Sequence, residues 1–115
     1  MVFDFTVSNY GNYAIIGLSG NLIEKSQALS LLEKADELAK ENCNRWAIDL
    51  DKLIYMNSSG LNTLIQLLTK SRVGGGEAVL FNMNKKITEL ILITKLNTLF
   101  KIANNKEDAL SILAV

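Results

Sequence analysis

Small polar residues are concentrated at positions 57–60, where the sequence reads Asn57-Ser58-Ser59-Gly60. Apolar residues precede this segment as in a strand, and apolar residues follow it at helical spacing. Asn and Ser are favoured N-caps because their side-chain oxygens accept hydrogen bonds from the free N–H groups of a first helical turn. A serine there is also well placed for phosphorylation, since those N–H groups and the helix dipole favour an anion. Capping explains one of these polar residues, and phosphorylation is the second interpretation.

Two carboxylates, Asp49 and Asp51, lie two positions apart at the end of the apolar run 45–50. On a strand this spacing places both side chains on one face, where they could bind a hard cation or act as an acid and base pair. Asp49 is enclosed by apolar residues, however, and Asp51 comes just before an expected turn. Structural hydrogen bonding is therefore the favoured interpretation of both.

The residue types exclude several chemistries. The chain has no histidine, which removes the commonest general base and the usual Ser-His and Cys-His nucleophile pairs. Cys43 is the only cysteine, so we expect a small, half-buried residue that forms neither an intrachain disulfide nor a zinc site. The glycines at 74–76 lack the Lys and Ser/Thr of a P-loop and predict a helix-to-strand turn. We expect no catalytic residue, no metal and no cofactor.

Length and composition predict one folded unit. The chain has 115 residues, of which 49% are hydrophobic and 21% charged, so we expect a single domain over residues 1–115. Twelve basic residues balance twelve acidic ones, which argues against direct nucleic-acid binding and against an anionic membrane surface as partner. No apolar run approaches the roughly 20 residues of a membrane-spanning helix. The N-terminus does not resemble a secretory signal, so we expect no membrane insertion and a cytoplasmic protein.

Hydrophobic periodicity predicts the elements that position these residues. An antiparallel hairpin is expected from strands at 3–7 and 13–18, the second ending at the turn residues 19–21. Further strands are expected at 45–50, 78–81 and 99–102, with helices at 26–39, 61–73, 87–94 and 107–113. The run 45–50 is typical of a central strand covered on both faces. The alternation predicts a single α/β domain, with a mixed four- to five-stranded sheet and about four helices packed on it.

The segment AIDLDKLIYMNSSGLNTLIQLL at 47–68 resembles the signature of STAS domains, in particular the bacterial anti-sigma factor antagonists. That signature is an apolar strand, then Asp-Ser-Ser-Gly-Leu and an apolar helix. LSGNLIEKSQALSLLEKADEL at 18–38 is similar to the family's first strand end and helix. GGEAVLFNMNKKITELILITKLNTLFKI at 75–102 is similar to its later strand and helix. The resemblance covers nearly the whole chain.

The resemblance implies a binding module rather than an enzyme. The family's phosphorylated serine aligns with Ser58, and its partner is both an anti-sigma factor and a serine kinase. In the family, the unphosphorylated antagonist binds that partner and releases the sigma factor. Phosphorylation ends binding, and a serine phosphatase resets the switch. The partner surface implied for this chain is listed here: Asn57, Ser58, Ser59, the helix residues Asn62 and Thr63, and Gly60, which would allow close approach.

One departure from the family pattern leaves a second function open. The family's Asp is Asn57 here, which removes a negative charge beside the hydroxyl but keeps a capping acceptor. The alternative is therefore a STAS subunit of a lipid-transport or sensory assembly that is not phosphorylated. An enzyme using Asp49 and Asp51 is a third, more distant interpretation.

Overall fold

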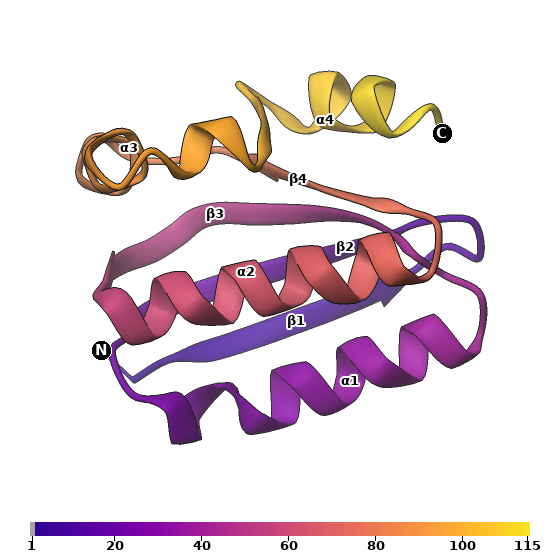
Figure 1. Cartoon of the computed structure of the whole chain (residues 1–115), viewed down its shortest axis with the longest axis horizontal. Helices are drawn as coiled ribbons and strands as arrows, with labels where there is room; N and C mark the ends of the chain where they lie inside the picture. The colour runs from indigo at the N-terminus through magenta and orange to yellow at the C-terminus, as the bar shows by residue number, and fades with distance from the viewer. Residues whose placement is uncertain (1) are drawn as a thin grey trace.

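The computed structural model describes residues 2–115 and contains a five-stranded sheet in the order β1-β2-β3-β4-β5 (Figure 1). The elements in chain order are β1 (Asp4–Asn9), β2 (Ala14–Leu22), the 3-10 turn η1 (Lys25–Ala28), α1 (Leu29–Lys40), β3 (Arg45–Met56), α2 (Ser58–Val73), β4 (Glu77–Phe81), α3 (Lys85–Ile93), η2 (Leu96–Thr98), β5 (Lys101–Ala103) and α4 (Lys106–Leu113). β1 pairs with β2 antiparallel, and the other neighbours pair parallel. The predicted mixed α/β sheet with four α-helices is confirmed.

Helices lie on both sides of the sheet. α1 and α2 run side by side along one face, and α4 lies on the other (Figure 1). β3 is the central strand, and its residues Trp46, Ala47 and Ile48 are all buried. Trp46 and Ile48 belong to the large core under α1 and α2, whereas Ala47 belongs to a smaller cluster under α4. Consecutive burial confirms the prediction of a strand covered on both faces.

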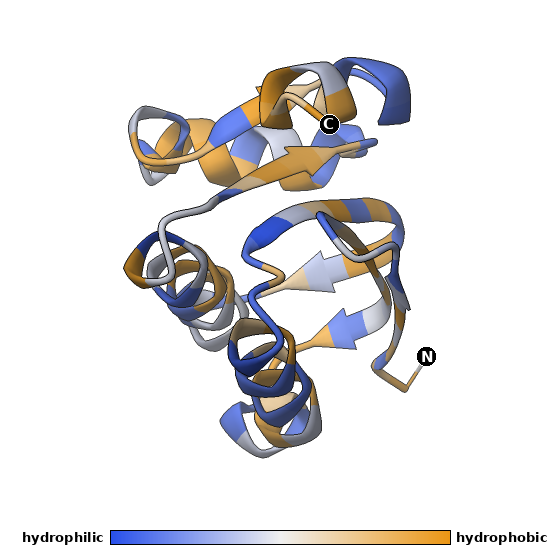
Figure 2. Ribbon diagram, turned by 90° about the vertical axis from the view of Figure 1, so that its right-hand side faces the viewer, coloured by the Kyte–Doolittle hydropathy of each residue, from blue (hydrophilic) through white to orange (hydrophobic). Residues whose placement is uncertain are grey.

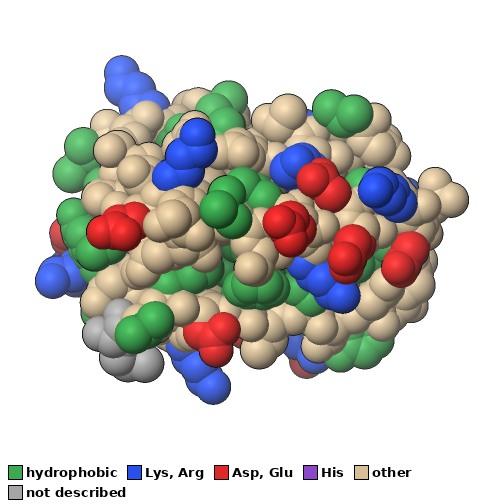
Figure 3. Space-filling model, turned by 90° about the horizontal axis from the view of Figure 1, so that it is seen from below, with side chains coloured by type: hydrophobic (Ala, Val, Ile, Leu, Met, Phe, Trp, Pro, Cys, Tyr) green, Lys and Arg blue, Asp and Glu red, His purple; other side chains and the backbone are tan. Residues whose placement is uncertain are grey.

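The outer surface of the α1–α2 layer is polar and of mixed charge. The residues Leu31, Ala35 and Leu38 of α1 are buried in the core, and Figure 2 shows hydrophilic and hydrophobic colours alternating along the helices. Figure 3 shows acidic and basic side chains interspersed on the side of the molecule that carries α1. One ion pair on this side joins Lys70 of α2 to Asp36 of α1 at 2.6 Å. This face therefore does not present a field of one sign.

Two strands are longer than expected. β2 continues to Leu22 instead of ending at 19–21, and β3 passes through Asp51 to Met56, so both predicted turns are wrong. The parallel pairing of the two strands continues to Leu22 opposite Met56, after register shifts. Cross-strand hydrogen bonding overrides the local turn preference of small polar residues, because it satisfies the backbone groups of both strands at once.

Backbone conformation and close packing both require glycine in the turn at 74–76. The predicted turn at 74–76 is confirmed, with Gly75 at φ 86°. A Cβ on Gly76 would lie 1.8 Å from the carbonyl oxygen of Asn44, so no larger residue fits there.

Cys43 is buried, with 1% of its surface exposed, rather than half-buried as expected. In the described part of the chain, no helix has the length and hydropathy needed to cross a membrane.

Candidate functional site

Asn57 connects β3 to α2 and caps the helix. Its backbone is extended, with φ −107° and ψ −162°, and its side-chain Oδ1 accepts hydrogen bonds from the N–H groups of Ser59 at 3.0 Å and Gly60 at 3.3 Å. Its Nδ2 group donates to the carbonyl oxygen of Ile23 at 2.9 Å. The predicted N-cap is therefore present, and the same side chain also reaches the end of β2.

Ser58 is the first residue of α2 and is exposed, whereas Ser59 is half-buried. Ser58 therefore lies at the positive end of the helix dipole, where added negative charge is favourable. The N–H groups of residues 59 and 60, however, already donate to Asn57. An anion at Ser58 would be stabilised by the dipole without displacing the cap. The expected site therefore depends on the helix dipole rather than on the N–H groups of residues 59 and 60.

Gly60 is buried, so the expectation that it allows a partner to approach closely is wrong. A Cβ at this position would lie 2.6 Å from the carbonyl oxygen of Leu22 and 2.6 Å from the Cβ of Met56. The close approach is that of the chain's own β2 and β3 to the first turn of α2. Glycine is needed here for internal packing because any larger residue would push the helix away from these strands.

The two helix residues assigned to the partner surface lie in different environments. Asn62 is exposed, but Thr63 has 2% of its surface exposed. The Thr63 hydroxyl donates to the carbonyl oxygen of Ser59 at 3.2 Å, which satisfies it within the helix. The expectation that Thr63 lies on the exposed side of α2 is therefore wrong. Its packing against the sheet follows from the position of α2, which helical spacing alone leaves open.

Sequence reasoning missed two exposed apolar residues close to Asn57, one bonded to it and one two positions before it in the chain. Ile23 has 41% of its surface exposed and is bonded through its carbonyl to Asn57. Tyr55, two positions before Asn57, has 45% exposed. Isolated exposed apolar residues are common, and of these two Ile23 is the one whose backbone bonds to the residue directly before Ser58. The only sequence signal was an isoleucine just after an expected turn.

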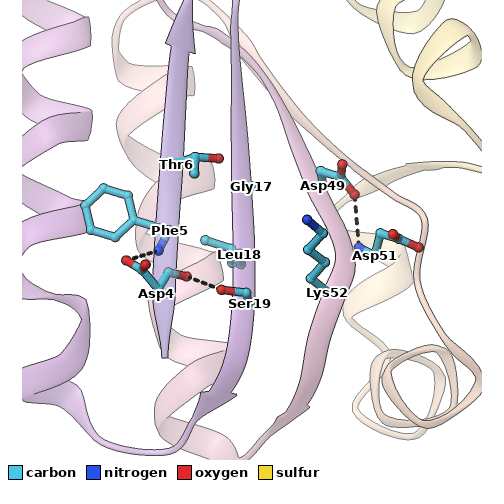
Figure 4. A pocket seen from close by; sticks show the side chains of 9 residues that line it. All are labelled: Asp4, Phe5, Thr6, Gly17, Leu18, Ser19, Asp49, Asp51 and Lys52. Atoms are coloured by element: carbon cyan, nitrogen blue, oxygen red, sulfur yellow. Dashed lines mark hydrogen bonds between the residues drawn. The ribbon is translucent and has the colours of Figure 1, made fainter. Parts of the chain in front are cut away.

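Asp49 and Asp51 line a pocket of about 220 Å³ on the open face of β1, β2 and β3 (Figure 4). An extra residue in β3 places Asp49 opposite Gly17 and Lys52 opposite Ser19, so the strict alternation assumed for the two aspartates is broken. Asp49 Oδ1 accepts the backbone N–H of Asp51 at 3.0 Å.

A second donor reinforces this arrangement. The same Asp49 oxygen accepts the side-chain amide of Asn82 at 3.3 Å. Asp49 therefore holds the backbone bulge of β3 against the end of β4, which agrees with the structural interpretation of Asp49, whereas Asp51 contributes its backbone N–H to this arrangement. Within residues 2–115, no group of three or more Cys, Asp or Glu side chains has the arrangement of a metal site.

The comparisons define the family. The STAS domain model matches residues 5–109, so the chain belongs to the STAS domain family. A curated relative, the anti-sigma F factor antagonist of Paenibacillus polymyxa, is 25% identical over 101 residues, which cover 88% of this chain and 86% of the relative. The resemblance identified from the sequence is thereby confirmed.

Solved structures share the fold at lower identity. The crystal structure of the Thermotoga maritima protein TM1081 aligns with a TM-score of 0.85 at 19% identity, covering 96% of this chain and 95% of that one. The phosphorylated form of the Bacillus cell fate determinant SpoIIAA aligns with a TM-score of 0.72 at 16% identity, covering 94% of this chain and 97% of that one. Its unphosphorylated form, titled an anti-sigma factor antagonist, aligns with a TM-score of 0.71 at 14% identity, covering 91% and 92%.

Proposed function

We propose that the chain is an anti-sigma factor antagonist that is switched by phosphorylation at Ser58. The observation that carries the proposal is the exposed Ser58 at the first position of α2, at the positive end of the helix dipole. Family membership and the curated anti-sigma F factor antagonist relative support the same function. The partner is an anti-sigma factor with serine kinase activity, and the reaction takes place in a bacterial cytoplasm, where sigma factors act.

The switch follows from local electrostatics. Unphosphorylated Ser58 presents a small neutral hydroxyl next to Asn57, whose amide bonds the backbone of the exposed Ile23, a surface that an apolar partner patch can cover. Phosphorylation adds about −1.5 to −2 charges at pH 7, which a partner would have to desolvate on binding. The helix dipole stabilises the added charge, so the domain stays folded while the partner is released. A serine phosphatase restores the binding form.

The test uses the anti-sigma factor kinases encoded in the same genome. Each purified kinase is incubated with the chain and ATP, and the phosphate is mapped by mass spectrometry. We expect modification at Ser58 in the wild type and none in Ser58→Ala. Ser59→Ala is the matched control, because Ser59 is the neighbouring, half-buried hydroxyl. Absence of phosphate at Ser58 with every kinase would contradict the switch.

A second candidate is a STAS subunit of a lipid-transport or sensory assembly that is never phosphorylated. The observation that favours it is Asn57, which stands where the family signature has Asp beside the serine. Purification from the native organism discriminates the two functions. Recovery of a kinase and a sigma-factor regulator supports the antagonist, whereas recovery of membrane transport components with unmodified Ser58 supports the subunit.

A further inference from the structure

Asn57 bonds two segments that are far apart in the sequence. Its Oδ1 caps α2, and its Nδ2 donates to the carbonyl oxygen of Ile23 in the connection between β2 and η1. The backbone N–H of Asn57 also donates to the carbonyl oxygen of Leu22 at 3.4 Å. The N–H groups of Ile23 and Glu24 in turn donate to Gln27 Oε1 at 2.9 Å each. The segment Leu22 to Gln27 is thus organised as one loop, and Asn57 joins it to the start of α2.

The aspartate of the family signature cannot make both of these bonds. An ionised aspartate offers acceptors alone, so it could cap α2 but could not donate to Ile23. Its second carboxylate oxygen would instead face the Ile23 carbonyl oxygen at the position of the present Nδ2, which is repulsive. The residue by which this chain departs from the family signature is therefore the residue that supplies the additional bond.

We propose that Asn57 is a positioning residue that holds Ile23 beside Ser58, so that the two form one contact surface for the anti-sigma factor. Ile23 is 41% exposed and has its backbone fixed by Asn57, which limits the freedom that partner binding would otherwise have to remove. Binding of the anti-sigma factor to this surface rests on the proposed function, whereas the positioning of Ile23 by Asn57 does not. In this chain the residue directly before Ser58 in the sequence is a neutral amide rather than a carboxylate.

The chain offers two matched controls. Asn84 has the same dual arrangement at another helix, where Oδ1 accepts the Ile87 N–H at 2.8 Å and Nδ2 donates to the Leu53 carbonyl oxygen at 2.9 Å. Asn105 caps α4 by accepting the Asp108 N–H at 2.9 Å. Asn84→Asp removes an equivalent donated bond at the start of α3, and Asn105→Asp changes the charge of the cap of α4.

The experiment compares Asn57→Asp with both controls by amide hydrogen exchange of the unphosphorylated chain and by titration with the anti-sigma factor kinase that binds the wild type. Loss of one net hydrogen bond predicts exchange at 22–28 that is faster by roughly three- to tenfold, and partner binding weakened by a similar factor. Ile23→Ala should weaken binding comparably. Neither control should alter exchange at 22–28 or partner binding.

The outcomes separate the two claims. Unchanged exchange at 22–28 in Asn57→Asp overturns the positioning role whether or not a partner is found. Faster exchange with unchanged affinity overturns the joint contact surface, as does unchanged affinity in Ile23→Ala. A wild-type chain that binds none of the anti-sigma factor kinases contradicts the proposed function and the role of this surface in partner binding. Amide hydrogen exchange at 22–28 still decides whether Asn57 positions Ile23.

Discussion

The side-chain amide of Asn57 donates a 2.9 Å hydrogen bond to the backbone carbonyl of Ile23, 34 residues earlier in the chain. The same side chain accepts the N–H groups of Ser59 and Gly60. One side chain therefore caps α2 and bonds the start of this helix to the segment that follows β2. The bond joins the segment that carries the exposed Ile23 to the residue directly before Ser58, so substitutions at Asn57 test both the stability of the fold and the proposed partner binding.

Asn57→Ala should destabilise the fold by about 1–3 kcal/mol, because it removes an N-cap and the bond to Ile23 together. Chemical denaturation measures the change in the free energy of unfolding. Asn57→Ser keeps a capping oxygen and lacks the donated amide, so it should lower the free energy of unfolding by less than Asn57→Ala does. Equal stability of the wild type and Asn57→Ala would contradict the role of this side chain in joining the two segments.

Ser58→Asp should leave stability unchanged or raise it by about 0.3–1 kcal/mol, since a negative charge in the first turn interacts favourably with the helix dipole. The same substitution should weaken binding of the anti-sigma factor, whereas Ser58→Ala should bind constitutively. Thermal unfolding and isothermal titration measure the two effects separately. Equal affinities of the aspartate and alanine variants would rule out the charge switch.

Gly60→Ala should destabilise the fold by about 1–3 kcal/mol, although alanine is the better helix former. The added Cβ would lie 2.6 Å from both the Leu22 carbonyl oxygen and the Met56 Cβ, so α2 has to move away from the strands. Denaturant titration reports the loss. A stabilised Gly60→Ala variant would mean that the helix start can shift without cost, which contradicts the tight packing seen here.

Asn62 and Thr63 should respond oppositely to replacement by alanine. Asn62 is exposed, so Asn62→Ala should leave the free energy of unfolding within about 0.5 kcal/mol of the wild-type value. Any effect of this substitution should be on partner binding. Thr63 is buried and bonded to Ser59, so Thr63→Ala should destabilise the fold by about 1–2 kcal/mol. Paired denaturation and binding measurements test both residues. A fold insensitive to Thr63→Ala would place that side chain on the surface.

Cys43 should make stability depend on alkaline pH. Burial raises the pKa of its thiol, and the nearby Glu41 carboxylate adds to the increase. The unfolded chain therefore loses the thiol proton first, near pH 8.5, and the folded chain only at higher pH. In that window stability should fall as pH rises, by up to about 1.4 kcal/mol per pH unit from this group.

The thiol contribution is isolated by comparing slopes of unfolding free energy against pH for the wild type and Cys43→Ala. The wild type should show the steeper decline above pH 8.5, because other titrating groups are common to both proteins. The buried thiol should also react slowly with alkylating reagents in the native state. Parallel slopes, or rapid native-state alkylation, would contradict the burial of Cys43.

The sequence by itself determined the features that depend on local pattern. The spacing of Leu31, Ala35 and Leu38 defines the buried side of α1. The continuous apolar run at Trp46 to Ile48 indicates a central strand, and Asn57 before an apolar helical stripe indicates a cap. These properties arise between neighbours in the chain, so periodicity and residue type are sufficient to predict them.

Only the tertiary structure decided how these parts meet. The extension of β2 and β3 to Leu22 and Met56 depends on backbone pairing between strands distant in sequence. The same pairing brings Ile23 to Asn57 and presses Gly60 against both strand ends. Whether Thr63 is buried depends on how α2 lies on the sheet. Each of these outcomes is set by non-local contacts, whose energies override the local preferences that a sequence pattern records.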